Sequence, residues 1–549
     1  MPAGGAGGGC LRDAPTDPAV RLDRLQHSSI GAKRPTPTMA TGTRNELTGL
    51  LGIAPEETLK AEDGSLFLAM KGLGPTPPSG RLLRGLTPWL DGQDARHVFL
   101  LTERKWREPW SGTETVQSYQ ELVHWERGAD GGRYRGTAWK GTALKMEDLV
   151  QAFRMEPHSL VDYAARRVNG AVISNREPLR LRVHYVPKPW GREGWYTGIE
   201  KRGVSCVQSG TGSTELPYAV GMFPAPLLST EEREPILLKT LEPHPDEVFG
   251  DLYLEVHDKK WETYVVLEVD PGAWPDGVGN LRAGLAPQRI EAYRAEHGDG
   301  WSAALTRDLR ERIGEYEAVR NEIDGLLETA LRGDGEDPAE PVLPARHAAL
   351  LAELPSGLRE REAAARKVVE SYLGSIPMRV GDVVSLPPGV LHSLQHGVKV
   401  VEFQTPTYER LIAMFAQRVI TQSQWDTERA LERMEKAPYV PAAPVPQIGE
   451  NGYSVERAVT YPEFMVDRVR LEATRSAGQD TGGGYRLLFV VEGMGQLTLP
   501  GGSSHTLVKQ DALILPATMG PFEVAAGAAG PLVYLDARPN PEGSADSAD

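Results

Sequence analysis

Four residues with metal-binding side chains lie in two short segments of the sequence. Glu255, His257 and Glu262 are close together, and His392 follows more than a hundred residues later. Two carboxylates and two imidazoles suit a borderline divalent cation such as Zn²⁺, with Fe or Mn also possible. Side chains alternate along a strand, so Glu255 and His257 should share one face while Val256 points to the other. We expect these four residues to hold one metal ion per chain.

The surrounding residues predict strands and a turn that would bring the four ligands together. Residues 263–269 are rich in β-branched and aromatic side chains and predict a strand that begins at Glu262. Pro387-Pro388-Gly389 predicts a tight turn that leads His392 into a further strand, which continues at 398–403. The alternative is that both histidines are hydrogen-bonded residues of a β-sandwich that binds no metal.

The sequence resembles the cupin family at the second of its two motifs, Gly-x5-Pro-x-Gly-x2-His, which is met by Gly381, Pro387, Gly389 and His392. The first cupin motif, His-x-His-x3–4-Glu, is met by His257 and Glu262, with Glu255 in place of the first histidine. This resemblance implies a mainly β fold built from cupin barrels, also called jelly-roll or double-stranded β-helix barrels.

The order of several features also resembles a type I mannose-6-phosphate isomerase, across roughly residues 185 to 537. Pro189-Trp190-Gly191 and the strand at 237–240 precede the first motif, and Glu402-Phe403-Gln404 follows the second. A helical insertion separates the two motifs, and a second, metal-free cupin copy follows them. The resemblance implies that the zinc ligands are Glu255, His257, Glu262 and His392, and that Arg410 faces the substrate.

The chain departs from this family at three places. Glu255 stands where the family has glutamine, which adds one negative charge to the site. Only residues 258–261 separate His257 from Glu262, whereas the family has a longer segment there. Arg410 lies two residues closer to the Glu-x-Gln strand, and a Ser-Asp pair between them is missing. These departures leave the identity of the sugar open.

The implied reaction is an aldose–ketose isomerisation through a cis-enediol, with mannose 6-phosphate and fructose 6-phosphate as the leading pair. Glu402 would be the base, because a barrel interior raises the pKa of a carboxyl group. Arg410 would hold enediolate or phosphate charge, with Lys239, Lys259 or Lys260 assisting. The alternative for Arg410 is a solvated helix residue.

Two other functions stay open for such a barrel. A Glu/His site can bind Fe(II) and activate oxygen, which would make the protein a cupin dioxygenase. A scaffold that has lost its activity would instead be a non-catalytic sugar-binding cupin.

Changes in composition and periodicity divide the chain. Leu305 to Leu331 recur at helical spacing, and further helices are predicted at 343–373 and 408–434. The predicted segments are a disordered 1–40, a mixed α/β region of unknown role at 41–180, a metal-binding cupin domain at 181–284 plus 375–436, a helical insertion at 285–374, a Pro-rich linker at 437–452, a metal-free cupin at 453–537 and a disordered tail at 538–549.

The overall composition restricts the partners. A net charge of −15 argues against a nucleic-acid partner, and no apolar run is long enough for a membrane helix. The first residues lack the apolar core of a secretory signal, and the only cysteines, Cys10 and Cys206, exclude a cysteine metal site and favour a reducing compartment. We expect a cytoplasmic protein with a small-molecule sugar phosphate as partner; the oligomeric state is left open.

Overall fold

The computed structural model describes residues 55–541, apart from 74–85, 87–88, 91, 108–115, 129–131, 142, 201–202, 211, 223–226 and 229–233. The predicted disordered segment 1–40, and all but the first four residues of the predicted tail 538–549, lie outside this range. Among the helices that are described, none is both long and apolar enough to cross a membrane.

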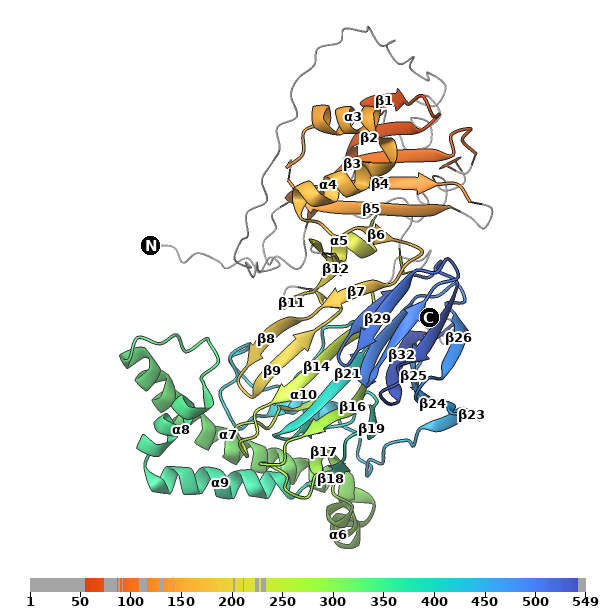
Figure 1. The fold of residues 1–549 in the computed structure, drawn as a ribbon. Coiled ribbons are helices and arrows are strands. Elements are labelled where there is room, and N and C mark those ends of the chain that lie inside the picture. Colours follow the sequence, from red (N-terminus) through yellow and green to blue (C-terminus); the bar gives the residue numbers. More distant parts are fainter. Residues whose placement is uncertain are drawn as a thin grey trace.

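The N-terminal part forms one six-stranded sheet in the order β1-β2-β3-β4-β5-β6 (Figure 1). Its strands are β1 (Glu57–Lys60), β2 (Leu66–Leu73), β3 (His97–Arg107), β4 (Val116–Glu126), β5 (Arg133–Lys140) and β6 (Ile173–Ser174). Strands β2 and β3 are parallel, and the other neighbours are antiparallel. The parallel pair places the turn before β2 next to the start of β3.

Two helices cover one face of this sheet. They are α3 (Met146–Met155) and α4 (Leu160–Val168), joined by the short 3-10 helix η2 (Pro157–Ser159). The ring of Phe153 on α3 lies 5.3 Å from that of Phe67 and 5.6 Å from that of Phe99, so the helix is fixed to β2 and β3 by aromatic contacts. The opposite face belongs to a core that continues into the rest of the protein.

Residues 179–220 connect the N-terminal sheet to the two sandwiches. The connecting elements are β7 (Leu179–Arg182), β8 (His184–Lys188), β9 (Gly191–Trp195), β10 (Ile199–Glu200), β11 (Gly203–Val204), β12 (Cys206–Ser209), β13 (Gly212–Glu215) and α5 (Leu216–Val220). Strands β7, β12 and β13 join the sheet of the C-terminal segment rather than that of the metal motifs.

Two facing sheets carry both metal motifs, and we call them the central sandwich. The six-stranded sheet, β19-β16-β21-β14-β9-β8, adds β14 (Leu237–Pro243), β16 (Glu262–Val269), β19 (Val383–Leu386) and β21 (Val398–Gln404). The five-stranded sheet, β18-β17-β20-β15-β22, consists of β15 (Leu254–Val256), β17 (Gly279–Leu285), β18 (Leu373–Met378), β20 (His392–Leu394) and β22 (Leu411–Met414). Leu241 and Tyr264 of the first sheet share one buried cluster with Leu281 and Leu394 of the second.

A helical insertion lies between β17 and β18 and covers the outer face of the five-stranded sheet. Its elements are α6 (Pro287–His297), η3 (Gly298–Gly300), α7 (Trp301–Gly333), α8 (Pro344–Glu353) and α9 (Ser356–Glu370). The predicted helical spacing of Leu305 to Leu331 falls within α7. Leu309 and Ile313 of α7 share a buried cluster with Leu254 and Val256 of β15. The helix therefore supports the strand that carries Glu255.

The predicted helix at 408–434 is wrong over most of its length. Residues 411–414 form β22, which pairs with β15, and only Thr427–Arg433 forms a helix, α10. Ile412 points into the central sandwich, while its neighbours Leu411 and Ala413 pack against α7. A segment that is apolar on both faces is equally compatible with a buried strand and a buried helix, and here the open edge of β15 decides the outcome.

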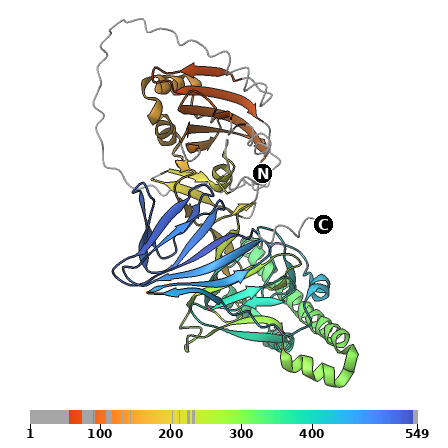
Figure 2. The same cartoon turned by 90° about the vertical axis from the view of Figure 1, so that its right-hand side faces the viewer.

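The C-terminal segment forms a second pair of facing sheets. Its strands are β23 (Val445–Glu450), β24 (Tyr453–Thr460), β25 (Phe464–Leu471), β26 (Ser476–Asp480), β27 (Arg486–Glu492), β28 (Met494–Thr498), β29 (Ser504–Val508), β30 (Ala512–Leu515), β31 (Pro521–Ala526) and β32 (Leu532–Pro539). The sheet orders are β13-β12-β7-β30-β27-β32-β25-β24-β23 and β26-β31-β28-β29. Figure 2 shows this sandwich in blue beside the central sandwich, with the N-terminal sheet and the helical insertion at opposite ends. The predicted fold class, mainly β with paired jelly-roll units and a helical insertion, is confirmed.

Replacing Leu309 with alanine tests whether α7 supports the central sandwich. Leu309 is fully buried, so the truncation should lower the free energy of unfolding by about 2–5 kcal/mol, as measured by urea unfolding. The matched control is Leu326→Ala on the same helix, where the side chain is 45% exposed and the change should stay within about 0.5 kcal/mol. Equal destabilisation by the two substitutions would contradict the packing role.

Candidate metal centre

Glu255 and His392 are brought together by direct strand pairing. They lie opposite each other where β15 and β20 pair in antiparallel register. Because side chains alternate along a strand, Leu254 and Val256 point outward into the cluster beneath α7, which leaves Glu255 to point inward. His257 follows at the end of β15, on the inner face. This part of the ligand set depends on the five-stranded sheet alone.

Glu262 comes from the opposite sheet and touches both imidazoles. Its Oε1 lies 3.3 Å from His257 Nε2, and its Oε2 lies 3.3 Å from His392 Nε2. Glu255 Oε1 is 4.0 Å from His257 Nε2. Both histidines and Glu262 are at most 2% exposed, and Glu255 is 13% exposed. The structure thus brings together all four residues that the sequence predicted as ligands.

The chemistry of this group fits a divalent metal ion. One ligand atom each from Glu255, His257 and His392 lies within 4.8 Å of the others. Among the described residues, neither ring nitrogen of His257 nor Nε2 of His392 has a hydrogen-bond partner, and the same holds for Oε2 of Glu255. Buried polar atoms without partners are costly, and a metal ion would satisfy them together. Nδ1 of His392 lies 2.9 Å from the carbonyl oxygen of Val390, which fixes the ring and leaves Nε2 for the metal.

Lys260 holds the fourth ligand in place. Its Nζ lies 2.6 Å from Glu262 Oε1, and its side chain is 7% exposed. Burial alone would raise the pKa of Glu262, but Lys260 and His257 outweigh it and hold that pKa well below the ordinary value. Burial, aided by Lys260, lowers the pKa of His257, which keeps its imidazole in the neutral form that binds metals. Glu262 and His257 are therefore in the ionisation states that suit a cation, whereas the carboxylates around His392 raise the pKa of that imidazole.

A second carboxylate lies beside the ligands on the six-stranded sheet. Glu402 on β21 is directly opposite Lys239 on β14, and its Oε2 lies 3.0 Å from Lys239 Nζ. Glu402 is 1% exposed, and burial raises its pKa well above the ordinary value although Lys239 opposes the shift; the charge of Glu262 raises it further. The sequence predicted both Glu402 and Lys239 as site residues, and the register of these strands places them together.

The ion pairs continue away from the metal ligands. Glu193 on β9 lies 3.7 Å from Lys239 Nζ and 3.1 Å from Lys188 Nζ. Burial would raise the pKa of Glu193, but Lys188 and Lys239 together hold it below its ordinary value. The sequence analysis did not single out Lys188 or Glu193. Neither residue stands out in the sequence, because their short strands mix buried and exposed side chains.

Arg410 lies immediately before β22, next to Glu255. Its Nε is 3.8 Å from Glu255 Oε2, and its guanidinium lies 4.5 Å from the centre of the Tyr253 ring. A second nitrogen donates a hydrogen bond to Thr421 Oγ1 at 2.8 Å. Arg410 is 13% exposed, so it is not the solvated helix residue of the alternative interpretation. Lys259 is exposed and lies outside this group, although the sequence analysis considered it.

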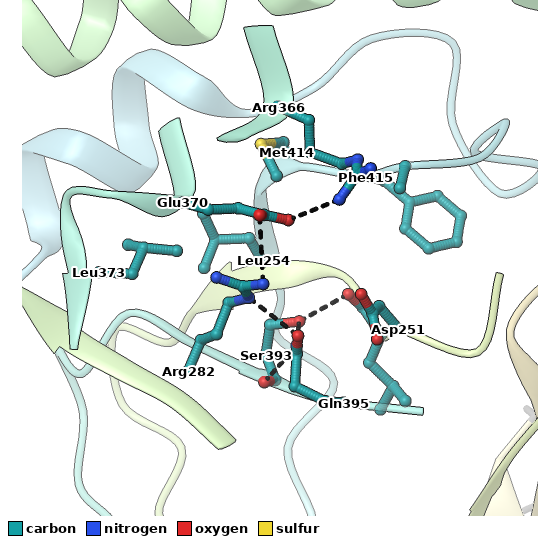
Figure 3. A pocket seen from close by; sticks show the side chains of 12 residues that line it. Asp251, Leu254, Arg282, Arg366, Glu370, Leu373, Ser393, Gln395, Met414 and Phe415 are labelled. Carbon is teal, nitrogen blue, oxygen red and sulfur yellow. Dashed lines mark hydrogen bonds and ion pairs between the residues drawn. The ribbon is translucent and has the colours of Figure 1, made fainter. Parts of the chain in front are cut away.

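A pocket that contains several charged and polar side chains lies on the outer face of the same strands (Figure 3). Leu254 and Ser393, the neighbours of Glu255 and His392, line it because they point to the outer face of the sheet. Glu370 of α9 lies 3.2 Å from Arg282 and 3.1 Å from Arg366, and Arg282 also donates to Gln395 at 2.8 Å. These contacts fix β17 and β20 to α9.

No protein-family model matches the chain, and no curated protein matches it. Similar solved structures include the mannose 6-phosphate isomerase of Bacillus subtilis, with 16% identity and a TM-score of 0.44 over 66% of this chain and 99% of that one. A putative mannosephosphate isomerase from Archaeoglobus fulgidus has 14% identity and a TM-score of 0.41 over 66% and 98% of the two chains. A mutant phosphomannose isomerase from Salmonella typhimurium has 13% identity and a TM-score of 0.45 over 65% and 99%.

Replacing His392 with alanine should remove one equivalent of bound zinc per chain. The substitution deletes one of the two proposed imidazole ligands. The remaining set of one imidazole and two carboxylates should hold zinc less tightly than the complete set. Metal content would be measured by elemental mass spectrometry after dialysis against zinc and then against buffer. His505→Ala, which removes a histidine outside the ligand group, should keep the wild-type content. Full zinc content in the His392 variant would contradict the ligand assignment.

Proposed function

We propose that this protein is a metal-dependent aldose–ketose isomerase that interconverts a sugar-phosphate pair. The leading pair is mannose 6-phosphate and fructose 6-phosphate. The observation that carries the proposal is the position of Glu402. A buried carboxyl group with a raised pKa lies in an ion pair with Lys239, beside four ligand-type side chains. A proton-transfer group next to a cation site is the combination that an enediol reaction needs.

Glu255, His257, Glu262 and His392 would hold the metal, with Zn²⁺ preferred and Fe or Mn as alternatives. When bound, the ion supplies Lewis acidity that polarises a sugar oxygen and favours the enediolate. The carboxylate at position 255, where the family has glutamine, lies 3.8 Å from Arg410. That arginine therefore offsets the additional negative charge of the ligand set.

Glu402 would move the proton between the two carbon atoms. In the direction from aldose to ketose, its carboxylate takes the proton from C2, and the resulting carboxylic acid returns it to C1, while the hydroxyl proton of O2 passes to O1. A raised pKa makes the carboxylate of Glu402 a stronger base, which suits the first half of this transfer. Lys239 holds Glu402 in one orientation through the 3.0 Å ion pair.

Arg410 and Lys239 would balance the negative charge of the substrate. Arg410 presents its guanidinium next to Glu255 and is fixed there by Tyr253, so it can face either enediolate oxygen or phosphate. Lys260, which the sequence analysis considered for phosphate, is instead paired with Glu262 at 2.6 Å. We therefore assign Lys260 to the support of the metal ligands.

Proton NMR of the zinc-loaded protein with mannose 6-phosphate in heavy water tests the reaction. Fructose 6-phosphate should form with loss of the C2 proton signal, and a chelator should stop the conversion. An unchanged spectrum across several sugar phosphates would reject the isomerase and leave the sugar-binding cupin. Oxygen consumption that depends on Fe(II) would instead identify the dioxygenase alternative.

Replacing Glu402 with glutamine should lower kcat by about 10²- to 10⁴-fold, because the variant keeps the shape of the side chain but loses the proton-transfer group. Metal content should stay at the wild-type level, since Glu402 is not a proposed ligand. The matched control is Glu268→Gln on the neighbouring strand β16, whose side chain is exposed and whose loss should leave kcat unchanged. Equal kcat in the Glu402 variant and the wild type would reject Glu402 as the base.

A further inference from the structure

Three histidines meet in the N-terminal sheet, whose strands β3 and β4 lie at the opposite end of the molecule from α7 and α9 (Figure 1). His97 is the first residue of β3, His124 lies on β4, and His158 lies in η2 between α3 and α4. One ring nitrogen from each lies within 4.8 Å of the other two. The proposed isomerase reaction uses none of these residues.

The strand register explains why two of the histidines are neighbours. His97 is opposite Glu126, and Phe99 is opposite His124, so His97 and His124 are diagonal neighbours on one face of the sheet. Their Nδ1 and Nε2 atoms are 3.1 Å apart. Two zinc-bound nitrogens at tetrahedral angles and bond lengths of ~2.0–2.1 Å lie roughly 3.3 Å apart, so this separation needs almost no adjustment.

The helical layer supplies the third imidazole. The centres of the His97 and His158 rings are 4.6 Å apart, and the rings meet edge to face. Phe99 forms the floor of the group, because its buried ring stacks on His124 at 4.2 Å. Metal sites commonly have apolar side chains on their protein side, which exclude water, and an exposed side through which the ion can enter.

A carboxylate lies beside the three histidines. Asp63 lies in the turn between β1 and β2, and its Oδ2 is 3.3 Å from His158 Nε2. The parallel pairing of β2 with β3 brings this turn to the start of β3, where His97 lies. Of the four residues, His158 is 52% and Asp63 is 43% exposed, which leaves a route for the ion from solvent.

The charges around the group favour a cation. Arg96 is paired with Glu126 at 3.0 Å, and Arg135 is paired with Asp162 at 2.9 Å. These nearby arginines are therefore largely compensated, while Asp63 contributes a negative charge.

We propose that His97, His124 and His158 form a second divalent metal site with a preference for zinc, beside the carboxylate of Asp63. Three imidazoles without sulfur are a ligand set that zinc binds in proteins, and Asp63 adds a negative charge next to it. The site and Asp63 together join four separate segments: the β1–β2 turn, β3, β4 and the η2 connection between the two helices. Its role is to tie the helical layer to the sheet.

His158→Gln is the most informative variant, because the side chain is half exposed and its loss leaves the packing of the sheet intact. Zinc binding to the full-length protein would be measured by equilibrium dialysis in a buffered zinc series, with elemental mass spectrometry as the readout. The wild type should bind two equivalents. In the variant, one equivalent should bind at least about tenfold more weakly, and Asp63→Asn should weaken the same equivalent.

Three further measurements separate this site from the one in the central sandwich. His505→Gln should bind zinc as the wild type does, which controls for the loss of a histidine as such. His392→Ala should keep the equivalent that His158→Gln weakens, so that the double variant loses both. In the wild type, Co²⁺ should give the strong visible absorption of a tetrahedral site, reduced in His158→Gln by the contribution of one ion. Identical zinc stoichiometry and affinity in the wild type and His158→Gln would overturn the proposal.

Discussion

The central sandwich depends on keeping the charge of Glu262 in an interior from which water is excluded. Removing a carboxylate from water costs several kcal/mol, and the cost is offset only where opposite charges and donors surround it closely. Lys260 provides the opposite charge at 2.6 Å. A slip of one residue in β16 would turn Glu262 to the other face of the sheet, away from Lys260. The ion pair with Lys260 therefore favours the observed register of β16.

The same constraint orders the remaining charged residues of the interior. Lys239 and Glu402 face each other across neighbouring strands, and Glu193 continues the alternation of sign toward Lys188. Alternating charges compensate one another, so the polar end of the sandwich can coexist with the apolar cluster at its other end. Breaking one pair would leave its partner buried and unbalanced, which is why residues far from the ligands affect them.

The sequence predicted which four side chains gather in the central sandwich better than it predicted their surroundings. Glu255, His257, Glu262 and His392 follow from motif spacing, because alternation along a strand and a tight turn are local properties. The pairing of Lys239 with Glu402, and the role of Lys260, depend on which strands become neighbours and in which register. The strand at 411–414 was predicted as a helix because its side chains are all apolar, so they show neither the two-residue period of a strand nor the 3.6-residue period of a helix. His97, His124 and His158 belong to separate elements, so no spacing in the sequence could group them.

Strand β7 has a consequence for the synthesis of this protein. It pairs with β30, and their register joins Leu179 to Ile514, more than three hundred residues later in the chain. When β7 leaves the ribosome its partner does not yet exist, so its edge stays open until nearly the whole chain has been made. The N-terminal sheet can form early from its own strands, but the nine-stranded sheet can close only at the end of translation. A truncated chain that lacks the C-terminal strands would therefore expose this edge permanently and would be prone to aggregate.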